Sequence, residues 1–141
     1  MIRTMITGIV AALLVFTASS LAAEAPPAPN VNASGTHLDV TAAQTHTVVK
    51  GDTLAKIAER YYGTQGIYCF PLILFANRQV VANPDEISPG MQLAIPELKL
   101  DLMNAAARAE LKSYTMEVAW WYSRNGKTAM KDALISFADT L

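Results

Sequence analysis

The fold of this chain is decided by two stretches, HTVVKGDTLAKIAERYYG at residues 46–63 and LILFANRQVVANPDEISPGMQLAIP at residues 72–96. The first opens with a short β-prone run at residues 47–49, which the Lys-Gly-Asp sequence after it interrupts. Apolar residues then recur at helical spacing on one face, and charged residues lie on the other. The apolar stripe consists of Leu54, Ile57, Ala58 and Tyr61. This pattern predicts a strand followed by an amphipathic helix whose cap is Asp52 or Thr53.

The second stretch predicts another helix and another strand. The helix is expected at residues 68–77, where Pro71 lies in the first turn and a missing amide donor costs little. Residues 83–86 predict a turn, and the Pro-Gly pair at residues 89–90 fits the centre of a type II turn. Residues 92–95 then predict the second strand. Two short strands are marginal alone, so we expect an α+β fold in which they pair antiparallel and cover both helices.

Both stretches, in this order and spacing, resemble the lysin motif (LysM) family. The first is similar to the family's opening strand, Gly-Asp-Thr-Leu loop and first helix. The second is similar to its second helix, Asn-bearing loop and closing PG-x-x-L-x-IP strand. The resemblance covers residues 46–96 and implies a βααβ domain at residues 46–97. Ala55 departs from the pattern, because many members carry an aromatic or polar residue there.

The resemblance implies non-catalytic binding of an N-acetylglucosamine polymer, either peptidoglycan or a chitin-like glycan, without a cofactor or a metal. The site would be a shallow groove between the loop after the first strand and the loop before the second. An N-acetyl group needs a donor, an acceptor and an apolar wall, for which Leu54 and Ile87 are candidates. The implied glycan-binding residues are Gly51, Asp52, Thr53, Leu54, Asn83, Pro84, Asp85, Glu86 and Ile87. Each also has a structural interpretation as a turn, cap or core residue, and Asn77 is expected to end a helix rather than to bind a ligand.

The N-terminal part predicts export. Residues 1–22 combine Arg3, an apolar stretch and small residues before a cleavage site after Ala22, as in a secretory signal peptide. A retained membrane anchor is the alternative, although the apolar stretch is shorter than the ~20 residues that a span requires. Residues 23–45 are rich in Pro, Ala and Asn without an apolar period, which predicts a flexible linker. We therefore expect the mature protein in the periplasm or associated with the cell wall.

Composition argues against several other classes of protein. The net charge is −1 and the basic residues are not clustered, which disfavours a nucleic-acid partner. Cys69 is the only cysteine and is interpreted as a small buried hydrophobe. After the LysM-like segment there is no histidine or cysteine, and the carboxylates lie among lysines and arginines. These features disfavour a wall hydrolase, which is kept as the alternative from the class of enzymes.

Residues 98–141 predict an α-helical hairpin. Two apolar stripes are separated by Arg-Asn-Gly and should face each other. The stripes are Met103, Ala107, Leu111, Tyr114, Val118 and Trp121 in the first arm, and Met130, Leu134, Phe137 and Leu141 in the second. Trp120, Trp121 and Tyr122 cannot share one helix face, so at least one ring either packs on the LysM-like segment or forms a partner surface.

Two other functions stay open at this point. The hairpin could bind a protein partner, which would make the chain an accessory or regulatory subunit of a cell-envelope complex. The NPD-x-I-x-PG pattern at residues 83–90 also resembles that of LysM domains in potassium-binding proteins, so a potassium or small-ligand sensor is the other alternative.

Overall fold

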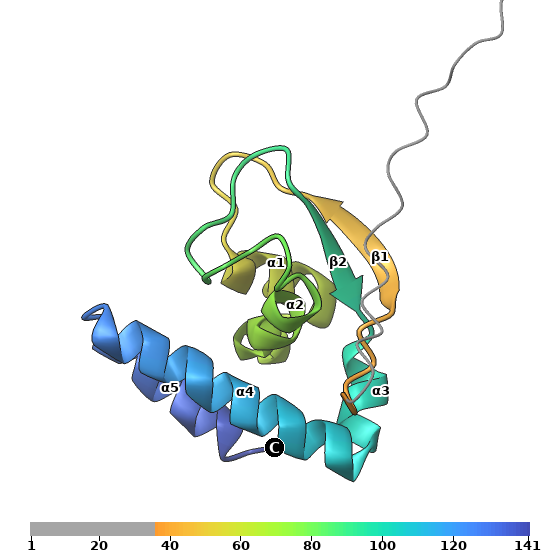
Figure 1. Ribbon diagram of the computed structural model, residues 1–141, viewed down its shortest axis with the longest axis vertical. Helices are drawn as coiled ribbons and strands as arrows, with labels where there is room; N and C mark the ends of the chain where they lie inside the picture. The colour runs from red at the N-terminus through yellow and green to blue at the C-terminus, as the bar shows by residue number, and fades with distance from the viewer. Residues whose placement is uncertain (1–35) are drawn as a thin grey trace, which may run out of the picture.

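The computed structural model describes residues 36–141, so the predicted signal peptide and the first part of the linker lie outside the described residues (Figure 1). The elements in chain order are β1 Ala42–Thr47, α1 Leu54–Tyr62, the 3₁₀ helix η1 Thr64–Cys69, α2 Phe70–Ala76, β2 Gln92–Pro96, α3 Leu98–Met103, α4 Ala105–Arg124 and α5 Thr128–Ala138. The α+β fold, with its βααβ order and C-terminal helices, is confirmed.

The two strands pair antiparallel, as expected, with His46 opposite Leu93 and a bulge near Ala42. The β-prone run at residues 47–49 predicted a later start for the first strand, which begins at Ala42. Val48 still continues the pairing, because its N–H donates to the Met91 carbonyl at 2.8 Å. Every side chain of β1 except His46 is exposed, so this strand has no apolar alternation that the sequence could reveal.

Helix α1 is capped by Thr53, whose hydroxyl accepts the Lys56 N–H at 3.2 Å. The helix ends at Gly63, where a φ of 77° favours glycine. Helix α2 is shorter than predicted, because η1 occupies the residues before Phe70. Burial raises the pKa of Cys69 to about 12, so its thiol stays protonated and packs as a small apolar group, as expected.

Asn77 joins α2 to the sheet. Its Nδ2 donates to the Ile73 carbonyl at 2.7 Å and to the Ala94 carbonyl at 2.8 Å, and its Oδ1 accepts the Ala94 N–H at 2.8 Å. The side chain therefore satisfies both backbone groups of one residue of β2 while it closes the helix. The prediction that Asn77 ends a helix is confirmed.

The C-terminal helices differ from the prediction in one place. Asn104 adopts an extended conformation and caps α4, accepting the Ala106 N–H at 2.9 Å. This cap separates the short helix α3 from the hairpin of α4 and α5. The assignment of Met103 to the apolar stripe was wrong, because its side chain is 73% exposed.

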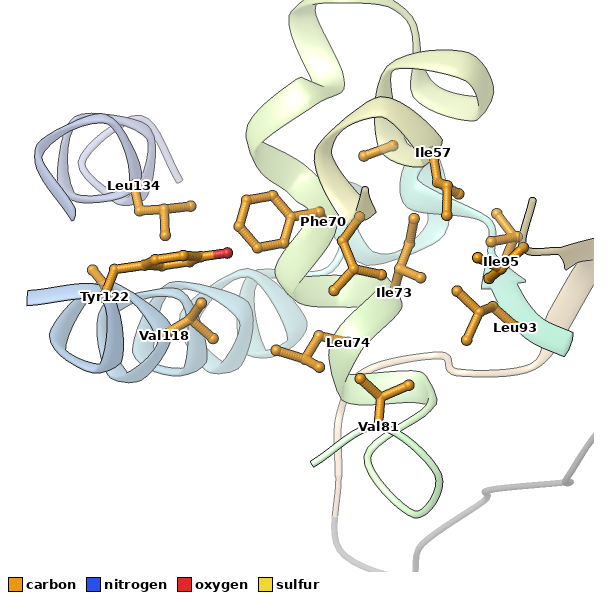
Figure 2. Packing of buried hydrophobic residues seen from close by; sticks show 14 residues of the cluster. Ile57, Phe70, Ile73, Leu74, Val81, Leu93, Ile95, Val118, Tyr122 and Leu134 are labelled. Carbon is orange, nitrogen blue, oxygen red and sulfur yellow. The ribbon is translucent and has the colours of Figure 1, made fainter. Parts of the chain in front are cut away.

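The hairpin packs on the LysM-like segment through a shared core. Figure 1 shows α1 and α2 between the sheet and the hairpin, and Figure 2 shows the Phe70 ring of α2 beside Tyr122 of α4 and Leu134 of α5. The rings of Phe70 and Tyr122 meet edge to face, with centroids 6.2 Å apart. Tyr122 is thus a core residue and not an exposed partner contact, whereas Trp120 is the exposed ring of the three.

Residues 36–45, which the sequence placed in the flexible linker, are packed against the fold. Leu38 and Val40 are buried in a second cluster with residues of α2 and α4. Glu110 accepts the Thr36 hydroxyl at 2.7 Å and the His37 N–H at 2.6 Å. The composition of this segment gave no sign of these contacts, because Leu38 and Val40 are its only large apolar residues and set no sustained period.

The buried carboxylate of Asp101 also holds this segment, accepting the Asp39 N–H at 2.7 Å. Burial raises the pKa of Asp101 to about 6, although the Asp39 N–H opposes the shift. In the unfolded chain the pKa of an aspartate is about 3.9. The raised pKa of Asp101 therefore adds to the free energy of unfolding in full below about pH 4, and this contribution is lost as pH rises through about 6.

We therefore expect Asp101→Asn to gain stability relative to the wild type as pH rises from 4.5 to 7.5, by about 1–2 kcal/mol. Urea unfolding at both pH values measures this change. Asp132→Asn alters an exposed aspartate of α5 and is the matched control. A stability difference between Asp101→Asn and wild type that stays constant with pH would contradict the prediction.

Candidate functional site

A pocket of about 240 Å³ lies where the two predicted loops meet. Its walls come from residues 52–55, residues 84–87 and the C-terminal hairpin. The lining residues are Asp52, Thr53, Leu54, Ala55, Pro84, Asp85, Ile87, Tyr122, Lys127 and Met130.

Most of the predicted glycan-binding residues fall in this pocket, and three do not line it. Gly51 is exposed, with a φ of 92°, and its carbonyl accepts the Lys56 ammonium at 2.9 Å. Asn83 shapes the second loop, because its Oδ1 accepts the Asp85 N–H at 3.2 Å. Glu86 is exposed on the same loop. Gly51 and Asn83 thus have the structural roles that their residue types also allowed.

The first loop is held rigidly by a buried polar cluster. Asp52 accepts the Val49 N–H at 3.0 Å and contacts Nε2 of His46 at 2.8 Å. The ring of His46 is buried, and its Nδ1 lies 3.2 Å from the Tyr61 hydroxyl. The Val49 N–H, and then His46, lower the pKa of Asp52, so its carboxylate is ionised. Sequence reasoning missed this role of His46, which it had placed at the edge of the linker.

The second loop is held from outside by an ion pair. The Lys127 ammonium, in the turn between α4 and α5, pairs with the Asp85 carboxylate. Pro84 is buried beneath this loop, and Ile87 packs against the main core. The buried Asp52 cluster therefore orders the first loop before any ligand arrives, and the exposed ion pair joins the second loop to the hairpin.

The order of the elements and the two loops agree with a comparison to known families, in which residues 46–96 match the LysM domain. Residues 46–96 are a LysM domain. LysM domains are non-catalytic modules that bind glycans containing N-acetylglucosamine. The LysM pocket described above thus lies between the two loops that the family resemblance implied.

Two relatives are similar to part of this chain. The potassium binding protein Kbp of Escherichia coli O6:H1 is 44% identical over 57 residues, which are 40% of this chain and 37% of Kbp. An uncharacterized protein of Deinococcus radiodurans is 47% identical over 51 residues, which are 36% of this chain and 19% of that protein. The chain thus spans well under half the length of either relative. No solved structure gives a significant match.

The hairpin side of the LysM pocket was not predicted. Tyr122, Lys127 and Met130 lie outside the LysM segment, so no family motif marks them. Tyr122 was considered only for packing on the LysM segment or for binding a partner. The contribution of Lys127 arises from the docking of the hairpin, which depends on contacts between residues far apart in the chain.

A larger pocket of about 580 Å³ lies between β1, the end of α1 and α3, and it contains none of the predicted site residues. Within residues 36–141, no group of three or more His, Cys, Asp or Glu side chains is placed to hold a metal ion. None of the helices in this part of the chain has the length and apolar character needed to cross a membrane.

Proposed function

We propose that this protein binds the N-acetylglucosamine-containing glycan of peptidoglycan through the LysM pocket, without catalysing a reaction. It would serve as an anchor or scaffold in the cell envelope, to which the predicted signal peptide at residues 1–22 would deliver it. The observation that carries the proposal is the meeting of the two predicted loops in one pocket that has both apolar and polar walls.

The lining of the pocket suits an N-acetylhexosamine unit. Ile87 is partly exposed and, together with the buried Leu54 and Pro84, forms an apolar wall for an acetamido methyl group or a sugar face. Thr53 and Asp85 add groups that can bond to hydroxyl or amide groups of the sugar. This combination of a few polar groups on an apolar wall is the usual composition of a small-ligand site.

The size of the pocket indicates weak binding for each domain. Its volume of about 240 Å³ is below the roughly 300–1,000 Å³ of most ligand sites, so it suits about one sugar unit. Such a contact yields little affinity, and retention on a wall would depend on the many equivalent units that a polymer offers.

The state of Asp52 supports binding rather than hydrolysis. A glycosidase requires one carboxylic acid that keeps its proton near neutral pH and a second carboxylate across the scissile bond. The pKa of Asp52 is lowered, which is the wrong direction for that acid. The Asp85 carboxylate is paired with the Lys127 ammonium.

We expect the wild-type protein to be retained on isolated peptidoglycan and to bind chitotetraose at millimolar concentration. Ile87→Glu should weaken chitotetraose binding at least ten-fold, because a charge replaces part of the apolar wall. Calorimetry measures the affinity, and circular dichroism checks the fold. Val80→Glu is the matched control, because Val80 lies in the same connection, is exposed and does not line the pocket.

A potassium-binding function is the second candidate, and the similarity to Kbp favours it. The same calorimetric experiment with potassium chloride, and sodium chloride as its control, separates the two. A potassium signal without any response to chitotetraose or peptidoglycan would replace the glycan proposal. The third candidate, a protein partner bound through the hairpin, is supported by the exposed ring of Trp120.

A further inference from the structure

We infer that the turn between α4 and α5 forms part of the glycan site, and that its Lys127 binds the sugar together with Asp85 of the second LysM loop. This inference rests on the proposed function and extends the site beyond the LysM segment. Tyr122, Lys127 and Met130 line the same pocket as the two LysM loops.

The turn is a rigid platform and not a loose end. Gly126 has a φ of 72°, and the Lys127 N–H donates to the Tyr122 carbonyl at 2.9 Å. Tyr122 itself is buried against Phe70 of the LysM core. Lys127 is therefore positioned by the same contacts that dock the hairpin.

The ion pair between Lys127 and Asp85 can take part in binding. Their side chains are 49% and 41% exposed, so both polar heads remain accessible to a ligand. The ammonium is a donor and the carboxylate is an acceptor, which together match the hydroxyl and amide groups of a sugar. The Lys127 nitrogen also lies 5.7 Å from the centre of the Tyr122 ring, which keeps the ammonium beside the apolar wall.

The test measures the affinity of the full chain for chitotetraose by calorimetry. Lys127→Met should lose about ten-fold in chitotetraose affinity, because a charged hydrogen-bond donor is removed. Asp85→Asn should weaken binding less, because the amide oxygen can still accept a hydrogen bond.

Lys112→Met is the matched control, because Lys112 is an exposed lysine of the hairpin that pairs with Asp139 at 3.7 Å and does not line the pocket. Exposed ion pairs contribute at most about 1 kcal/mol, so all three variants should fold. Unchanged or higher affinity in Lys127→Met would overturn the inference and leave the glycan proposal standing. Failure of the wild type to bind either chitotetraose or isolated peptidoglycan would instead refute the proposed function itself.

Discussion

Asn77→Ala is expected to lower the free energy of unfolding by about 3 kcal/mol. The side chain is 1% exposed and makes hydrogen bonds to Ile73 and to both backbone groups of Ala94. Alanine would leave the N–H and carbonyl of Ala94 unpaired in a site that water does not reach. An unpaired buried polar group costs about 1–3 kcal/mol. This single substitution would leave two such groups, the N–H and the carbonyl of Ala94, without their partner.

Urea unfolding followed by circular dichroism measures this loss. Asn104→Ala is the matched control, because Asn104 is an exposed asparagine that caps α4, and loss of such a cap typically costs about 1 kcal/mol. If Asn77→Ala lost no more stability than Asn104→Ala, the hydrogen bonds to β2 would not hold the sheet against α2.

Phe70→Ala is expected to cost about 3–5 kcal/mol, as is usual when a large buried ring is truncated. Phe70 is 1% exposed and lies between the LysM core and the hairpin, beside Tyr122 and Leu134 (Figure 2). The cavity left by the ring would weaken both the LysM core and the docking of α4 and α5. We therefore expect the whole described fold to lose stability together.

Two probes test this cooperativity. Both tryptophans, Trp120 and Trp121, lie on α4, so their fluorescence follows the hairpin while far-UV circular dichroism follows the whole chain. The two transitions should coincide in the wild type and in Phe70→Ala. Phe75→Ala is the matched control and should cost less, because Phe75 is only partly buried, at the edge of the second cluster. A hairpin transition that is separate from the rest in the wild type would contradict a shared core.

The docking of the hairpin also connects stability with the proposed function. Lys127 pairs with Asp85 from the turn that follows α4, and Tyr122 of α4 packs on Phe70 of the LysM core. A chain cut after residue 97 would retain the LysM loops but would lose one side of the pocket. The proposed glycan affinity of this protein is therefore a property of the whole described fold and not of the LysM segment alone.

Local patterns explain why the helices could be predicted well. The stripe from Leu54 to Tyr61, the Thr53 cap and the glycine at residue 63 are signals within one helix. The strand β1 could not be found in the same way, because its side chains are mostly exposed and it is fixed by pairing with β2. The packing of residues 36–45 could not be predicted for a related reason. The residues that hold this segment, Glu110 and Asp101, are distant from it in sequence.

The sequence by itself determined the βααβ order, the two loops of the candidate site and the presence of a C-terminal hairpin. These features follow from apolar periodicity, capping residues and turn residues, which act over a few neighbouring positions. Only the tertiary structure decided that Tyr122, Lys127 and Met130 complete the pocket and that His46 fixes Asp52. Such contacts depend on how helices pack and on which charges meet across the fold, and no local pattern encodes them.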